Sequence, residues 1–150
     1  MIKRTIKNRI QKGFFKNKAI IIYGARQVGK TTLIKDIMAD DPESGIYLNC
    51  DEADIRESLT NATSTKLKEI FGNKKVIYID EAQRVKNIGL TLKIIVDTFS
   101  DLQVVATGSS ALELSNTIME PLTGRAFEYH LYPFSAEELS SKYSDQEFKR

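Results

Sequence analysis

The sequence predicts an α/β domain built on a mostly parallel, five-stranded sheet with helices on both faces. Short runs rich in Val and Ile alternate with helical patterns along the chain, which is typical of parallel sheets buried on both sides. Glycine, hydroxyl and acidic residues follow several of these runs directly, and such sheets bind ligands at the carboxyl ends of their strands. With 150 residues, the chain is long enough for one domain with one core.

Five segments have the composition of buried strands, and helical spacing of apolar residues separates them. The predicted strands cover residues 19–23, 46–50, 76–79, 102–107 and 126–132. The predicted helices cover residues 31–40, 55–59, 67–71 and 88–99. A last helix is predicted to begin at Ser135, because Ser135 and Glu138 form a capping box.

Residues 1–18 are predicted to form a basic, amphipathic helix ahead of a core at residues 19–150. Its apolar residues recur every four positions, at Ile2, Ile6, Ile10 and Phe14. Its charged residues are all basic: Lys3, Arg4, Lys7, Arg9, Lys12, Lys16 and Lys18. Two interpretations fit this pattern. The helix docks on the core with its basic face in water, or the basic face contacts a phosphate backbone or another anionic surface.

Bulk composition excludes several classes of protein. The net charge is +2, so the chain as a whole is not built to bind polyanions. No apolar run approaches the roughly 20 residues of a membrane-spanning helix, and the N-terminus lacks the layout of a signal peptide. The single cysteine, Cys50, cannot form an internal disulfide and is expected to be a small buried side chain rather than a reactive thiol. We therefore expect a cytoplasmic protein.

A glycine-rich loop follows the first predicted strand and fits the pattern G-x-x-x-x-G-K-[ST] without a mismatch. Its residues are Gly24, Ala25, Arg26, Gln27, Val28, Gly29, Lys30 and Thr31, with Thr32 next. Glycines let the backbone approach phosphate groups, and successive amides together with the helix N-terminus attract anions. We expect Lys30 to reach the β- and γ-phosphates, Thr31 to bind Mg²⁺, and Thr32 to lie near the α-phosphate. The loop therefore predicts a nucleoside triphosphate site, most simply for ATP with Mg²⁺.

Two carboxylates, Asp80 and Glu81, follow the third predicted strand. Asp80 is placed to hold the hydration shell of Mg²⁺. Glu81 can accept a proton from a water that attacks the γ-phosphate. Gln83 and Arg84 follow closely, and the sequence leaves open whether they support these carboxylates or are ordinary surface residues.

Hydroxyl groups lie at the end of the fourth predicted strand, at Thr107, Ser109 and Ser110. One of them is expected to orient the attacking water or to sense the γ-phosphate. Ser109 is our first choice, since Ser110 can instead cap the helix that follows.

Arg125 precedes the fifth predicted strand. It either reaches the γ-phosphate of a neighbouring subunit in a homo-oligomer or is a structural arginine. His130, within that strand, is expected to be structural.

These motifs, in this order, resemble the AAA+ superfamily of P-loop ATPases, and more closely a group of bacterial and archaeal predicted ATPases. The resemblance is carried by residues 24–33, 80–83 and 107–110, by Gly124-Arg125 and by Pro133-Phe134-Ser135. It implies the strand order 5-1-4-3-2. It also implies Walker A roles for Gly24, Gly29, Lys30 and Thr31, and Walker B roles for Asp80 and Glu81. Ser109 or a neighbour would be sensor 1, where many relatives have Asn.

Such ATPases carry a helical lid after the core and a C-terminal domain. We expect both to be absent from these residues, so that this part alone hydrolyses ATP slowly. The leading interpretation is a domain that binds and hydrolyses ATP and thereby moves an attached or partner domain. A helicase-like half of a nucleic-acid motor and a non-catalytic nucleotide switch remain as alternatives. A GTPase is disfavoured because the guanine-reading pattern N/T-K-x-D does not occur.

Overall fold

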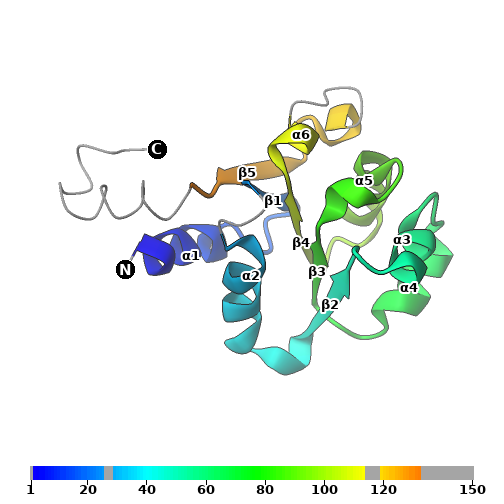
Figure 1. Cartoon of the computed structure of the whole chain (residues 1–150). Coiled ribbons are helices and arrows are strands. Elements are labelled where there is room, and N and C mark those ends of the chain that lie inside the picture. Colours follow the sequence, from blue (N-terminus) through cyan, green and yellow to red (C-terminus); the bar gives the residue numbers. More distant parts are fainter. Residues whose placement is uncertain (1, 26–28, 114–118, 133–150) are drawn as a thin grey trace.

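The computed structural model describes residues 2–25, 29–113 and 119–132. Its centre is a five-stranded sheet in the order β2-β3-β4-β1-β5 (Figure 1). The strands are β1 (Ala19–Tyr23), β2 (Gly45–Asn49), β3 (Val76–Asp80), β4 (Gln103–Gly108) and β5 (Ala126–His130). All four pairings are parallel, so the predicted fold class and the strand order implied by the resemblance are confirmed.

Helices cover both faces of the sheet. They are α1 (Ile2–Lys12), α2 (Lys30–Ala39), α3 (Ala53–Leu59), α4 (Ser64–Phe71), α5 (Ile88–Thr98) and the single turn α6 (Ser110–Glu113). Short 3-10 turns occur at η1 (Pro42–Ser44), η2 (Ala82–Arg84) and η3 (Glu120–Leu122). The helix predicted from Ser135 and the Pro133-Phe134-Ser135 segment lie outside the described residues.

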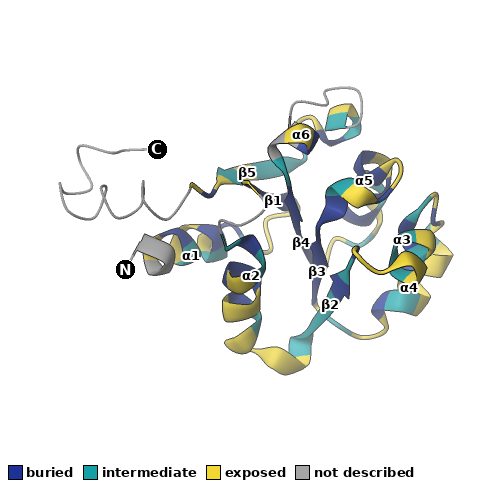
Figure 2. Cartoon of the chain, in the orientation of Figure 1, coloured by how far each residue is buried: buried dark blue, intermediate teal, exposed yellow. Residues whose placement is uncertain are grey.

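Strand alternation divides the core into two layers. Ile20 and Ile22 of β1 pack with α1 and α2, whereas Ala19, Ile21 and Tyr23 face the layer made by α3, α4 and α5. Successive side chains of a strand point to opposite faces, so a fully apolar strand fills both layers. The buried residues accordingly concentrate on the central strands (Figure 2).

The N-terminal helix docks on the core, as the first of its two interpretations predicts. Ile6 and Ile10 are buried, and the Lys7 ammonium pairs with the carboxylates of Asp36 at 3.4 Å and Asp40 at 3.1 Å on α2. The helix is shorter than predicted. It ends at Lys12, and two left-handed residues, Phe15 and Asn17, then turn the chain towards β1.

Cys50 is fully buried, as its sequence context predicts. Burial, with the nearby Asp80 and Asp51 carboxylates, raises the pKa of the Cys50 thiol to about 12. A thiol that stays protonated is a poor nucleophile, so Cys50 acts as a small core residue.

None of the helices in the described ranges is both long and apolar enough to cross a membrane.

Candidate nucleotide-binding site

The predicted site residues gather at the carboxyl edge of three adjacent strands. The glycine-rich loop follows β1, the acidic pair lies at the end of β3, and Thr107 lies near the end of β4. These strands are neighbours in the sheet, in the order β3-β4-β1. Parallel pairing brings their carboxyl ends to one edge, which is why residues up to 83 positions apart in the sequence can share one site.

The glycine-rich loop is anchored at both ends. The Gly24 amide donates to the carbonyl oxygen of Gly108 at 3.1 Å, which ties the start of the loop to β4. Gly29 has a φ of 92°, a left-handed conformation that a glycine adopts without strain. Gly29 is also the N-cap of α2 and contributes no side-chain cap, so the first amides of the helix remain available to an anion. Arg26, Gln27 and Val28 lie outside the described residues.

Lys30 begins α2 and is 2% exposed. Its ammonium donates to the carbonyl oxygens of Gly24 at 2.8 Å and Ala25 at 2.9 Å. A buried ammonium must be compensated by acceptors. Loop carbonyls therefore hold the cation directly beside the backbone where phosphate is predicted to bind.

The Asp80 carboxylate is the centre of the site. It is 1% exposed and accepts hydrogen bonds from three hydroxyl groups. Thr31 Oγ1 donates to Oδ2 at 2.6 Å, Tyr47 donates to the same oxygen at 2.5 Å, and Thr107 Oγ1 donates to Oδ1 at 2.5 Å. Hydrogen bonds to a carboxylate are short and roughly twice as strong as neutral ones. Asp80 thus joins α2, β2 and β4 to the end of β3.

Tyr47 is a site residue that the sequence analysis missed. It lies on β2, opposite Tyr78 in the pairing register, and its hydroxyl reaches across to Asp80 on β3. Burial raises the pKa of the Tyr47 phenol, and the hydrogen bond to Asp80 raises it further, so the hydroxyl remains a neutral donor. Within a strand-like run, Tyr47 looks like any half-buried aromatic residue. Only the adjacency of β2 and β3 could have identified it.

Thr107 connects the two acidic residues. Its hydroxyl donates to Asp80 and accepts from the Glu81 amide at 2.9 Å. Glu81 itself has a φ of 58°, an uncommon conformation for a residue with a side chain. The left-handed turn separates the directions of the two carboxylates, and that of Glu81 accepts instead from Gln83 Nε2 at 2.7 Å.

The hydroxyl residues at the end of β4 and directly after it have different surroundings. Thr107 is the one whose hydroxyl joins the acidic pair. Ser109 is half-buried and presents its backbone amide to Gln83 Oε1 at 3.3 Å. Ser110 begins α6, but its side chain lies outside the described part of the chain.

The sequence left the roles of Gln83 and Arg84 open, and the structure gives the two side chains different surroundings. The Gln83 amide contacts Glu81 and Ser109. Arg84 points away and forms an exposed ion pair with Asp51 at 3.0 Å.

Arg125 lies far from the phosphate loop of its own chain. Its carbonyl oxygen accepts from the Ala19 amide at the start of β1, and the loop follows the other end of that strand. At about 3.3 Å per residue, the five-residue strand separates them by roughly 15 Å. The guanidinium pairs with Asp97 at 2.9 Å. The hydrogen bond with Arg125 lowers the pKa of Asp97, and the hydrogen bond with Lys93 lowers it further to a smaller extent.

His130 lies at the end of β5, and its ring lies 5.4 Å from that of Tyr23 and 6.5 Å from that of Tyr132, measured between centroids.

The site residues suit a magnesium ion that arrives together with the phosphates of a nucleotide. The described residues contain no group of three or more His, Cys, Asp or Glu side chains arranged for a metal. One carboxylate with a neighbouring hydroxyl, however, suits Mg²⁺, which usually takes one or two protein oxygens together with phosphates and waters. The Thr31–Asp80 pair therefore fits the ion of a magnesium–nucleotide complex.

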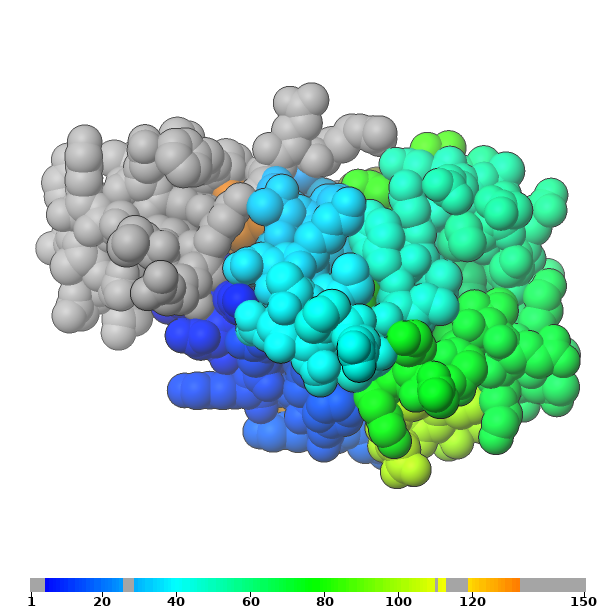
Figure 3. All heavy atoms as spheres, turned by 90° about the horizontal axis from the view of Figure 1, so that it is seen from below, coloured from blue at the N-terminus to red at the C-terminus, as the bar shows by residue number. Residues whose placement is uncertain are grey.

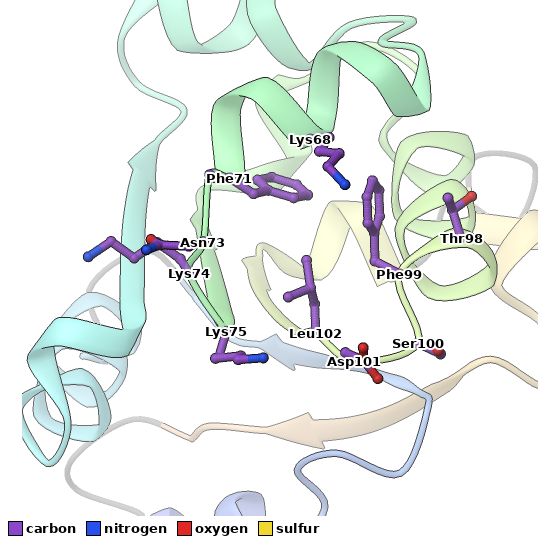
Figure 4. Close-up of a pocket in the computed structure, with 11 residues that line it drawn as sticks. Lys68, Phe71, Asn73, Lys74, Lys75, Thr98, Phe99, Ser100, Asp101 and Leu102 are labelled. Atoms are coloured by element: carbon purple, nitrogen blue, oxygen red, sulfur yellow. The ribbon is translucent and has the colours of Figure 1, made fainter.

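A cavity of about 410 Å³ lies at the opposite edge of the sheet. The segments before β3 and β4 line it, and the rings of Phe71 and Phe99 meet edge to face inside, 5.8 Å apart (Figure 4). Figure 3 views the molecule from below the orientation of Figure 1. The cavity is therefore separate from the phosphate loop and from the acidic pair.

Thr107→Val is expected to lower the free energy of unfolding by about 2–3 kcal/mol. The valine leaves one buried carboxylate oxygen without its donor and the Glu81 amide without its acceptor, while it keeps the shape of the side chain. Urea denaturation measures the change. Thr107→Ser, which retains the hydroxyl, is the matched control and should recover most of the loss. Equal losses in both variants would show that the methyl group matters rather than the hydrogen bonds.

Known proteins share the sequence family and the fold of this chain. A sequence family described as an AAA domain matches residues 16–140. An uncharacterized protein of Methanocaldococcus jannaschii is 32% identical over 133 residues, which are 82% of this chain and 28% of that protein. The chain thus spans less than a third of this curated relative.

Solved structures share the fold at low sequence identity. AMPPCP-bound DnaA from Aquifex aeolicus has a TM-score of 0.61 at 16% identity, over 96% of this chain and 50% of that one. Bacteroides Pif1 bound to ssDNA has a TM-score of 0.56 at 17% identity, over 87% of this chain and 41% of that one. The family match covers most of the chain, and the fold, with the loop after its first strand, agrees with it. The chain belongs to the AAA domain family and has the P-loop nucleotide-binding fold.

Proposed function

We propose that this domain binds ATP with Mg²⁺ and hydrolyses it to ADP and phosphate. The observation that carries the proposal is the 2.6 Å hydrogen bond from Thr31 to Asp80. It joins the threonine of the phosphate loop to the acidic residue that ends β3, and these two types of residue hold Mg²⁺ in P-loop NTPases. Their direct contact supports a shared ion between them.

In this proposal the loop from Gly24 to Thr32 encloses the phosphates. Arg26, Gln27 and Val28 contribute backbone amides along with Gly29, and the N-terminus of α2 adds its positive dipole end. The ammonium of Lys30 exchanges its contacts with loop carbonyls for oxygens of the β- and γ-phosphates. Because the phosphate oxygens would replace the carbonyl oxygens as acceptors, the buried ammonium would remain compensated throughout.

Glu81 is the proposed general base. It accepts a proton from water while the water oxygen bonds to the γ-phosphorus and the bond from that phosphorus to the β–γ bridging oxygen breaks. Asp80 cannot easily take this role, because three hydroxyl donors already occupy its carboxylate. Ser109, at the end of β4, is the proposed contact to the γ-phosphate or the attacking water. The magnesium ion, when bound, neutralises charge that develops on the phosphates.

We propose that Arg125 acts on the nucleotide of a neighbouring subunit, in a homo-oligomer. Its position at the amino edge of the sheet, beside Asp97, removes it from its own phosphate loop but leaves it on the surface. Closure of such an interface around ATP would transmit hydrolysis to an attached or partner domain.

The nucleic-acid motor is the weaker alternative. The Bacteroides Pif1 structure is bound to ssDNA, but its likeness to this chain concerns the fold alone. Within the described residues, two lysines of the basic N-terminal stretch form contacts inside the domain. Lys7 pairs with α2, and Lys18 donates to the Gly124 carbonyl at 2.7 Å. These contacts support the docking of the helix rather than a path for a phosphate backbone.

Glu81→Gln is expected to retain ATP binding and to lose about 10²–10⁴ in turnover, because the amide cannot accept the proton. Phosphate release and the binding of a fluorescent ATP analogue measure the two effects separately. Lys30→Ala is the comparison that should lose binding itself, and Lys66→Ala, which removes an exposed lysine on α4, should change neither. Wild-type turnover in Glu81→Gln would remove Glu81 as the base.

Arg125→Ala is expected to lower turnover by about 10³ or more at concentrations where the protein is assembled. In a dilute, monomeric sample it should have no effect. Lys93→Ala is the matched control, since it removes the other partner of Asp97 but keeps the guanidinium. Turnover measured across a dilution series, alongside sedimentation, tests this. An equal loss in the monomer would contradict a role in trans.

A further inference from the structure

The side-chain amide of Gln83 bridges two parts of the site that the proposed reaction must coordinate. Its Nε2 lies 2.7 Å from Glu81 Oε1, and its Oε1 lies 3.3 Å from the backbone nitrogen of Ser109. The bridge therefore runs from the proposed base to the end of β4, where the γ-phosphate contact is proposed.

The chemistry of its two partners fixes which way the amide points. An ionised carboxylate only accepts hydrogen bonds, and a backbone amide only donates. The NH₂ group of Gln83 must then face Glu81, and its carbonyl oxygen must face Ser109. Glutamine is the residue that supplies both groups at this reach. Glutamate would set two carboxylates against each other, and methionine would supply neither hydrogen bond.

The turn that carries Gln83 is itself well held. Gln83 lies in η2, where the Arg84 amide donates to the Glu81 carbonyl at 3.1 Å and the Val85 amide donates to the Ala82 carbonyl at 3.0 Å. Ala82 is fully buried. A side chain on a fixed turn can hold its partner in one orientation, whereas a glutamate alone loses considerable rotamer entropy when it is ordered.

We propose that Gln83 is a positioning residue: it orients the Glu81 carboxylate and couples that orientation to Ser109, directly after β4. The inference rests on the proposed hydrolysis. If Ser109 moves when the γ-phosphate binds, the side-chain amide of Gln83 moves with it and changes the orientation of Glu81. Asp80, held by three hydroxyls, stays in place meanwhile, so the two carboxylates are controlled separately.

The test uses the full-length protein with Gln83→Ala and the near-isosteric Gln83→Glu. Both are expected to lower kcat by about 10–100-fold, since a small misplacement of a reacting group has effects of this size. The KM and Kd for ATP should stay within about twofold. Added to Glu81→Gln, Gln83→Ala should cause little further loss, because Gln83 acts only through Glu81. Arg84→Ala, on the same turn but paired with Asp51, is the matched control and should match the wild type.

The inference is overturned if Gln83→Ala retains wild-type kcat, if Gln83→Glu restores it, or if the losses multiply in the double variant. A residue that merely fills space or stabilises the turn would give one of these results. If the wild type and Gln83→Ala both hydrolyse ATP at the wild-type rate while Glu81→Gln is inactive, the inference about Gln83 is overturned but the proposed function is not. A wild-type protein that binds ATP but releases no phosphate overturns the proposed function and the inference with it.

Discussion

The carboxylate of Asp80 is the point on which the arrangement of the site depends. Three hydroxyls from α2, β2 and β4 converge on a side chain that water barely reaches. A buried charge is costly unless hydrogen bonds compensate it, so these donors fix the position of the carboxylate and, through it, of one another. The start of α2, and with it the end of the phosphate loop, is thereby held against the centre of the sheet.

The parallel sheet makes this convergence possible. Its order puts β4 between β1 and β3, so that one residue of β4, Thr107, can contact both acidic residues at the end of β3. The same order leaves the amino edge for the cavity beside Phe71 and Phe99, for Arg125 and for the turn after α1.

Much of this could be predicted from the sequence, because local patterns carry it. The apolar runs with intervening helices predict the α/β class, and the loop from Gly24 to Thr31 with Asp80 predicts where the candidate site lies. Strand order came from the resemblance to known ATPases, since spacing alone does not determine which strands pair. Tyr47 and the bridging role of Gln83 escaped prediction for the same reason. Both depend on which segments become neighbours and on where their side chains point, which short patterns do not contain.

The most direct test of this account compares ATP affinity with and without Mg²⁺ in the wild type and in Asp80→Asn. If Thr31 and Asp80 hold the ion of a bound nucleotide, Mg²⁺ tightens binding to the wild type, and Asp80→Asn loses that gain while it keeps the affinity for ATP measured in EDTA. Titration calorimetry gives both values, and circular dichroism confirms that the variant is folded. An equal gain from Mg²⁺ in both proteins, or no gain in the wild type, would contradict the central place of Asp80.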